Sequence, residues 1–183
     1  MISYLSQYYP LSEEAEKDAR TLVQTLHKPK GSFLIKEGQS VNSFFLLKKG
    51  LVRSFFQKEE VQITQWFSME GDNVAATQPL YDQQPSREYI ECLEDCEFLF
   101  FTGEDLHFLC EKHNCFNTLY RKIIEEYCKI IETRLFTLQT MSAQERYHFL
   151  LEDSPKLIQR VPLGYIASYL GISQETLSRV RSK

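Results

Sequence analysis

The pattern of apolar and polar positions changes character along the 183-residue chain. Residues 12–26 carry apolar side chains at helical spacing behind the capping residue Ser12, which predicts an N-terminal helix. Between residues 28 and 102, short apolar or alternating runs are separated by turn residues, as is typical of strands. Helical spacing returns over residues 115–141, without a proline or glycine. The sequence therefore predicts an α+β protein.

The strand-like part contains at least six short runs rich in Phe, Ile, Val, Tyr and Thr. The runs span residues 32–38, 43–50, 51–57, 61–72, 87–95 and 96–102. Short strands at this spacing favour an antiparallel sandwich or jelly roll. Two runs, 44–47 and 98–101, are apolar on both faces and are also compatible with buried helix, although they are too short for most helices.

The long helix carries a stripe of apolar residues whose spacing alternates between four and three. These residues are Phe116, Tyr120, Ile123, Tyr127 and Ile130. Such a stripe needs a partner, and its heptad-like period favours a dimer seam. Packing along the β domain of the same chain is the alternative. Capping boxes at residues 102–105 and 142–145 predict further helices on either side.

The last stretch, residues 163–183, has the pattern of a helix-turn-helix. Apolar residues at helical spacing in 163–170 are followed by Gly171, which can take the positive φ that ends a helix. Ser173 is a good N-cap for a second helix, and Leu177 and Val180 give that helix its own inward stripe. The two predicted helices and their tight turn match the DNA-binding motif.

The outward face of this second helix is polar and partly basic. It carries Gln174, Glu175, Ser178, Arg179 and Arg181, which can bond base edges or phosphates. Residues 154–183 hold five basic residues and one acidic residue, a net charge of +4, so the rest of the −4 chain carries −8. A basic end on an acidic body suits a phosphate-facing surface. An ordinary helical hairpin with a solvated, charged face would show the same pattern.

Other classes of protein fit the sequence poorly. No apolar run approaches the ~20 residues of a membrane span, and the N-terminus lacks a signal peptide, so we expect a cytoplasmic protein without a membrane partner. The odd count of five cysteines favours free thiols. His107, Cys110, His113 and Cys115 do not converge on one point of a helix, so no metal and no cofactor is expected. None of the four histidines falls in a predicted strand, which argues against a cupin-like enzyme.

Two stretches of the sequence resemble the Crp/Fnr family of bacterial transcription regulators. Residues 166–179, IASYLGISQETLSR, are similar to the family's recognition signature. The glycines Gly31, Gly38, Gly50 and Gly71, the last followed by Asp, resemble the family's cyclic-nucleotide-binding-type jelly roll. The resemblance implies a jelly-roll sensor domain over residues 1–114, a dimerisation helix over 115–141 and a helix-turn-helix domain over 142–183.

The resemblance also implies partners and residue roles. It implies a homodimer that binds palindromic double-stranded DNA, and it makes RNA polymerase a candidate partner. Gln174, Glu175 and Arg179 fall where the family reads bases, whereas Ser173 and Thr176 fall where its hydroxyls contact phosphates. Ser178, Arg181 and Lys183 complete the predicted DNA-binding set. For Glu175, base reading and a favourable interaction with the helix N-terminus are equally compatible with the sequence.

The chain departs from the family's cyclic-nucleotide binders at the ligand-binding positions. Ala75 and Ala76 stand where those members have Gly-Glu, and Arg87, after Ser86, is displaced by one residue from the expected arginine. We therefore expect no cyclic AMP binding, and Val74, Ala75, Ala76, Ser86 and Arg87 remain the candidate lining for an unknown small-molecule effector. No cysteine precedes Cys92 to hold an iron–sulfur cluster.

Two further expectations concern the C-terminal end. The sequence ends shortly after Arg181, so no β wing beside the recognition helix is expected. The alternative function is a small-molecule sensor whose C-terminal helices mainly contact protein.

Overall fold

The computed structural model describes residues 1–76, 78–82 and 84–182. These residues form two units. Unit 1 comprises residues 1–54 and 67–127, and unit 2 comprises residues 55–66 and 128–183. Each unit is described by itself below. Strands β4 and β5 and helix α4 each continue from one unit into the other.

In the described residues, two short helices precede eight strands, a π-helical turn separates the sixth strand from the seventh, and the rest of the chain is helical. The strands are β1 (Gln24–Lys28), β2 (Phe33–Ile35), β3 (Ser43–Lys49), β4 (Val52–Lys58), β5 (Val61–Ser68), β6 (Asn73–Val74), β7 (Tyr89–Cys92) and β8 (Cys96–Thr102). The helices are α1 (Ile2–Leu5), α2 (Glu13–Leu22), η1, a π-helical turn (Gln78–Asp82), α3 (Gly103–Lys112), α4 (Asn114–Thr140), α5 (Ala143–Asp153), α6 (Pro155–Arg160), α7 (Leu163–Leu170) and α8 (Gln174–Arg181).

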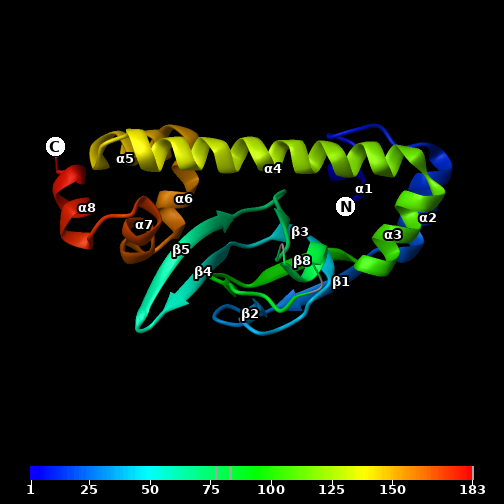
Figure 1. The fold of residues 1–183 in the computed structure, drawn as a ribbon, viewed down its shortest axis with the longest axis horizontal. Helices are drawn as coiled ribbons and strands as arrows, with labels where there is room; N and C mark the ends of the chain where they lie inside the picture. The colour runs from blue at the N-terminus through cyan, green and yellow to red at the C-terminus, as the bar shows by residue number, and fades with distance from the viewer. Residues whose placement is uncertain (77, 83, 183) are drawn as a thin grey trace. The chain divides into compact units, whose positions relative to one another are not determined.

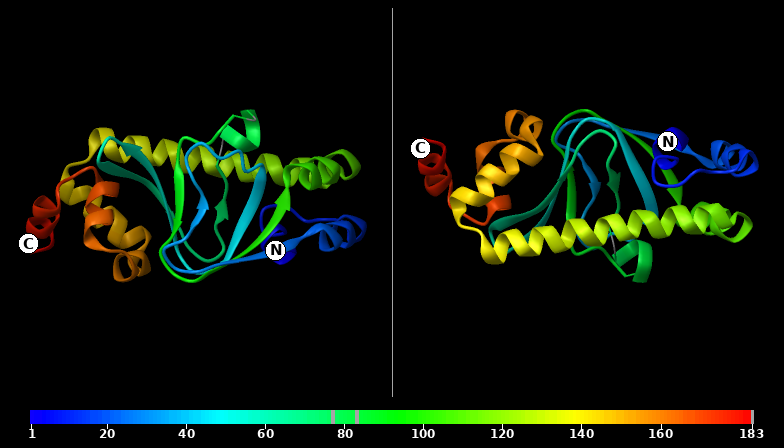
Figure 2. Two further views of the ribbon diagram at one scale, coloured as in Figure 1. Left: turned by 90° about the horizontal axis from the view of Figure 1, so that it is seen from below. Right: turned by 90° about the horizontal axis from the view of Figure 1, so that it is seen from above.

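The strands form two four-stranded sheets, in the orders β1-β8-β3-β6 and β2-β7-β4-β5. Figures 1 and 2 draw these strands as arrows. Phe45 and Phe98 from the first sheet pack with Ile35, Val52 and Ile90 from the second in one buried cluster. The pairs β1–β8, β3–β8, β3–β6 and β2–β7 are antiparallel. The prediction of an antiparallel jelly roll in an α+β chain is therefore confirmed.

The first strand replaces the end of the predicted N-terminal helix. Helix α2 begins after Ser12 as predicted, but it ends at Leu22, and Val23 already has an extended backbone. Residues 24–28 pair along their whole length with β8, and this long-range ladder outweighs the local helical pattern. As a result His27 lies in a strand, contrary to expectation, with its side chain exposed.

A second core in unit 1 lies among the helices. Ala15 and Ala19 of α2 pack with Leu109 of α3 and with Phe116 of α4. Helix α3 begins at the predicted capping box, in which the Thr102 hydroxyl accepts from the Asp105 N–H at 3.1 Å. This cluster covers the N-terminal part of α4.

The residues of the predicted dimer seam of α4 therefore differ in burial between the N-terminal and the C-terminal part of the seam. Phe116 is fully buried and Ile123 is 7% exposed in the core of their own chain, where Tyr120 also packs, 6.4 Å from Phe44 between ring centroids. Phe116 and Ile123 are therefore covered by their own chain, whereas Tyr120 is only half-buried. Tyr127 is 40% exposed, and Ile130 is half-buried.

Unit 2 combines the C-terminal helices with residues 55–66. Helix α5 starts at the predicted capping box, where the Ser142 N–H donates to Glu145 at 2.7 Å. Helix α6 begins at Pro155, because proline suits the first turn of a helix. Leu150 of α5 and Leu157 of α6 are buried. In the described parts of the chain, no helix is long and apolar enough to cross a membrane.

Candidate nucleic-acid interface

The turn between α7 and α8 is fixed by local chemistry. Gly171 has φ 67° and ψ 36°, the left-handed conformation that ends α7, and its N–H donates to the Ser168 carbonyl at 3.1 Å. The Ile172 N–H donates to the Ala167 carbonyl at 3.0 Å. The Ser173 hydroxyl then accepts from the Thr176 N–H at 3.2 Å and opens α8. The predicted helix-turn-helix is present, with the predicted cap and turn residues.

The inward faces of the two helices fix the direction in which α8 presents its polar side chains. Ile166, Ala167, Leu170 and Leu177 are at most 2% exposed, and Val180 is half-buried. Since Leu177 is anchored in this small core, residues on the other side of α8 must point outward.

The predicted DNA-binding residues of α8 gather on this outward surface. The side chains that are exposed are Ser173, Gln174, Glu175, Ser178, Arg179 and Arg181. Thr176 is half-buried, and Lys183 lies outside the described residues. Hydrogen-bond donors and acceptors on one exposed helix face can bond base edges and phosphates.

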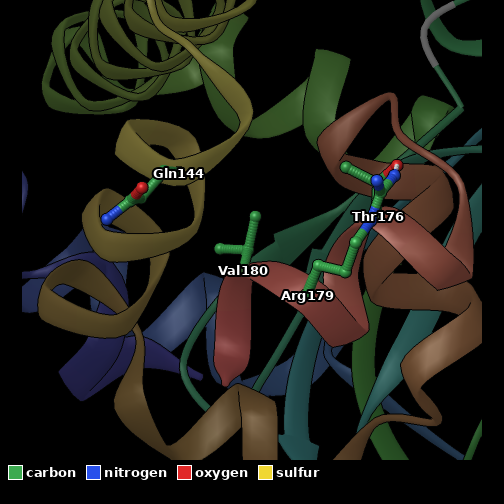
Figure 3. A pocket seen from close by; sticks show the side chains of 4 residues that line it. All are labelled: Gln144, Thr176, Arg179 and Val180. Atoms are coloured by element: carbon green, nitrogen blue, oxygen red, sulfur yellow. Dashed lines mark hydrogen bonds between the residues drawn. The ribbon is translucent and has the colours of Figure 1, made fainter. Parts of the chain in front are cut away.

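A recess of about 310 Å³ lies beside this face (Figure 3). Thr176, Arg179 and Val180 of α8 line it, together with Gln144 from the first turn of α5. The Arg179 guanidinium turns back and donates to the Thr176 hydroxyl at 3.1 Å. Gln144 was not predicted for this surface, since no local pattern indicates that the start of α5 lies next to α8.

The structure gives Glu175 a local role. Its pKa is held below the usual range, first by a hydrogen bond from its own backbone N–H, then by the Ser173 hydroxyl and by the charge of Arg179. The carboxylate therefore engages the N-terminal end of α8, as expected for an acidic residue in the first turn of a helix.

Most of the candidate ligand-binding residues of the jelly roll pack against or bond to other residues of the protein. Val74 and Ala76 are buried in the sandwich core, and Ala75 is half-buried. The buried Ser86 hydroxyl donates to the Glu88 carbonyl at 2.9 Å, whereas Arg87 is exposed. Arg87 lies in a bend before β7.

The histidines and cysteines make ordinary contacts. His107 pairs with Glu111 at 3.2 Å, and His113 bonds Asp18 at 2.8 Å. Among the described residues, no three His, Cys, Asp or Glu side chains are grouped to hold a metal ion. All five cysteines are free thiols, as their odd count predicted.

Comparison with known proteins extends the resemblance to both units. The cyclic nucleotide-binding domain family matches residues 25–113. The Anaerobic regulatory protein of Haemophilus influenzae is 27% identical over an alignment of 195 residues, and this alignment covers 98% of this chain and 74% of that protein. The Fumarate and nitrate reduction regulatory protein of Vibrio cholerae is 28% identical over 182 residues, covering 91% and 72%. The structure of FixK2 from Bradyrhizobium japonicum has the same fold, with a TM-score of 0.73 and 21% identity over 87% of this chain and 83% of that chain.

Proposed function

We propose that the chain is a transcription regulator of the Crp/Fnr type, a cytoplasmic homodimer that binds a palindromic DNA site through α8. The observation that carries the proposal is the exposed polar face of α8, held on a buried helix-turn-helix core. Family members with this architecture are regulators and not enzymes.

Base recognition would rest on few side chains. Arg179 can donate two hydrogen bonds to guanine O6 and N7, and Gln174 can bond adenine N6 and N7. In the free protein Arg179 donates to Thr176, so base contact would release the Thr176 hydroxyl toward a phosphate. Ser173 and Ser178 add exposed hydroxyls at the same surface.

The exposed apolar part of α4 supports the dimer. Tyr127, Ile131, Leu135 and Leu138 are between 40% and 53% exposed and follow one another at spacings of four, four and three. Two copies that paired along this stripe would bury it, as in a coiled coil. The two α8 helices would then have to meet half-sites about one DNA turn apart, ~34 Å.

We propose that cyclic AMP is not the effector. Ala75 and Ala76 replace the Gly-Glu pair of the family's cyclic-nucleotide binders, so the carboxylate that would hold the ribose is missing at that position. The Ser86 hydroxyl is engaged by Glu88 backbone groups, and Arg87 is exposed. Isothermal titration with cyclic AMP should show no saturable heat.

A salt titration of DNA binding tests the main proposal. Arg179→Ala should weaken binding to the preferred site by about 1–3 kcal/mol, because a base contact is lost. Lys156→Ala removes an equal charge from the exposed surface of α6 and is the matched control, which should not change sequence preference. If the wild-type protein bound only small molecules and showed no salt-dependent DNA binding, a sensor whose C-terminal helices contact protein would be favoured instead.

A further inference from the structure

Strand β5 ends one sheet, so one row of its backbone groups faces away from β4. Unpaired N–H and C=O groups at a sheet edge need hydrogen-bond partners or protection from other chains. The tip of the β4–β5 hairpin, residues 55–66, groups with the C-terminal helices in unit 2. The partners of this edge therefore come from the helices of unit 2.

The side chain of Ser168 in α7 forms hydrogen bonds with two backbone groups at the edge of β5. The Ser168 hydroxyl accepts from the Thr64 N–H at 2.9 Å and donates to the Gln62 carbonyl at 3.0 Å. Residues two apart in a strand point their backbone groups to the same edge, so Ser168 takes the place of a neighbouring strand. A hydroxyl can do this because it donates and accepts at once.

Tyr169, the next residue of α7, contacts both β5 and α4. The Tyr169 ring meets the Trp66 ring of β5 edge-on, with 6.0 Å between centroids. On α4, the Arg134 guanidinium lies 3.7 Å from the centroid of the Tyr169 ring and donates to the Tyr169 backbone carbonyl. Such ring and cation contacts resist sliding as well as separation.

We call these contacts the α7 clasp: Ser168 and Tyr169 of α7, Gln62, Thr64 and Trp66 of β5, and Arg134 of α4. The clasp residues belong to α7, β5 and α4, and none of them is a residue of α8. It would act on α8 through α7, because Leu170 of α7 and Leu177 of α8 are both buried and Gly171 fixes the turn between the two helices. Its residues are therefore positioning residues.

We propose that the α7 clasp holds the recognition helix in the orientation in which it meets DNA, and that a shift of the β4–β5 hairpin changes DNA affinity through it. This inference rests on the proposed DNA-binding function. A helix that is already held in its binding orientation loses less conformational freedom when it binds, and so binds more tightly. The hairpin would thus give the jelly roll a route to α8 that is separate from α4.

The test uses Ser168→Ala, which removes both hydrogen bonds, and Ser168→Thr, which keeps the hydroxyl. Ser168→Ala should lower affinity for the selected DNA site about tenfold, because two hydrogen bonds are lost, and Ser168→Thr should restore most of it. Dimer dissociation and far-UV circular dichroism should be unchanged in both variants. A merely structural role would also change those two measurements.

Trp66 reports the clasp without DNA, because it is the only tryptophan of the chain. Acrylamide quenching of its fluorescence should increase in Ser168→Ala and return toward wild type in Ser168→Thr. If Ser168→Ala bound the site as tightly as wild type, or more tightly, the positioning role would be wrong. If the wild-type protein bound no DNA at all, the proposed function itself would fail, and these two failures are distinguished by the wild-type titration alone.

Discussion

The two halves of α4 carry apolar stripes of similar period but have different surroundings. In the N-terminal half, Phe116, Leu119 and Ile123 are at most 7% exposed, in a core shared with α2 and α3. In the C-terminal half, Ile131 and Leu135 are 47% and 53% exposed. The period of a stripe shows that a helix face needs a partner, but it does not tell which partner covers it.

The difference separates two kinds of stability. Burial inside one chain contributes to folding at any protein concentration, whereas burial between two copies contributes only when they associate. The N-terminal half should therefore determine the stability of the monomer, and the C-terminal half should determine the dimer. Four substitutions test this contrast, from the largest expected effect to the smallest.

Phe116→Ala should have the largest effect. It removes a fully buried ring and leaves a cavity, which typically costs about 3–5 kcal/mol. Chemical unfolding should show this loss at every protein concentration. Leu135→Ala is the comparison, and its effect on unfolding should grow with protein concentration; the contrast would be wrong if both losses were independent of concentration.

Leu135→Asp should break the dimer. A carboxylate in the exposed stripe would lose its hydration when two copies pair, so self-association should weaken at least tenfold, about 1.4 kcal/mol. Sedimentation velocity across a dilution series measures this. Thr133→Asp introduces the same charge on the opposite side of the helix, where the side chain is also exposed, and should leave the dimer intact. Equal dissociation of both variants would contradict dimerisation through the exposed apolar stripe of α4.

Arg134→Ala should have a moderate effect on unit 2. The substitution removes the contact between the guanidinium and the Tyr169 ring and the hydrogen bond to the Tyr169 carbonyl, which together should cost about 1–2 kcal/mol. Arg134→Lys keeps the charge without the planar group and should recover only part of the loss. Denaturant unfolding followed by Trp66 fluorescence measures both variants. Full recovery by lysine would show that charge alone matters.

Asp18→Asn should have the smallest effect, at the covered end of α4. The Lys112 and His113 side chains hold the pKa of Asp18 below its ordinary value of 3.8. A lowered folded-state pKa stabilises the protein above the unfolded value, and this stability is lost as pH falls through the folded value. Asp18→Asn should therefore lower the melting temperature slightly at neutral pH, and the difference should shrink below about pH 3.8. A difference that stayed constant with pH would exclude the ion pair as its cause.

The local features were predictable because neighbouring residues determine them. Thr102, Ser142 and Ser173 each cap a helix through a hydrogen bond three residues on, and Gly171 takes the positive φ that only a few residues tolerate. The order of the jelly roll, the long helix and the helix-turn-helix was also predictable, because patterns among neighbouring residues indicate each of the three.

Features that depend on distant partners were not predictable. Strand β1 forms because β8 pairs with it, about 70 residues later in the chain. The bond between Thr64 and Ser168 joins residues 104 positions apart, and no local pattern in either segment indicates it. Phe116 and Leu135 are both large apolar residues of α4, yet only the fold shows that Phe116 is covered by its own chain and Leu135 is exposed.

Selection of binding sites from random double-stranded DNA with the purified 183-residue chain tests the central claim most directly. We predict a two-fold-symmetric motif whose half-sites are centred about 10 base pairs apart, and whose enrichment is lost in Leu135→Asp but kept in Thr133→Asp. An enriched motif without two-fold symmetry, or no enrichment at all, would contradict a dimeric regulator that recognises DNA through α8.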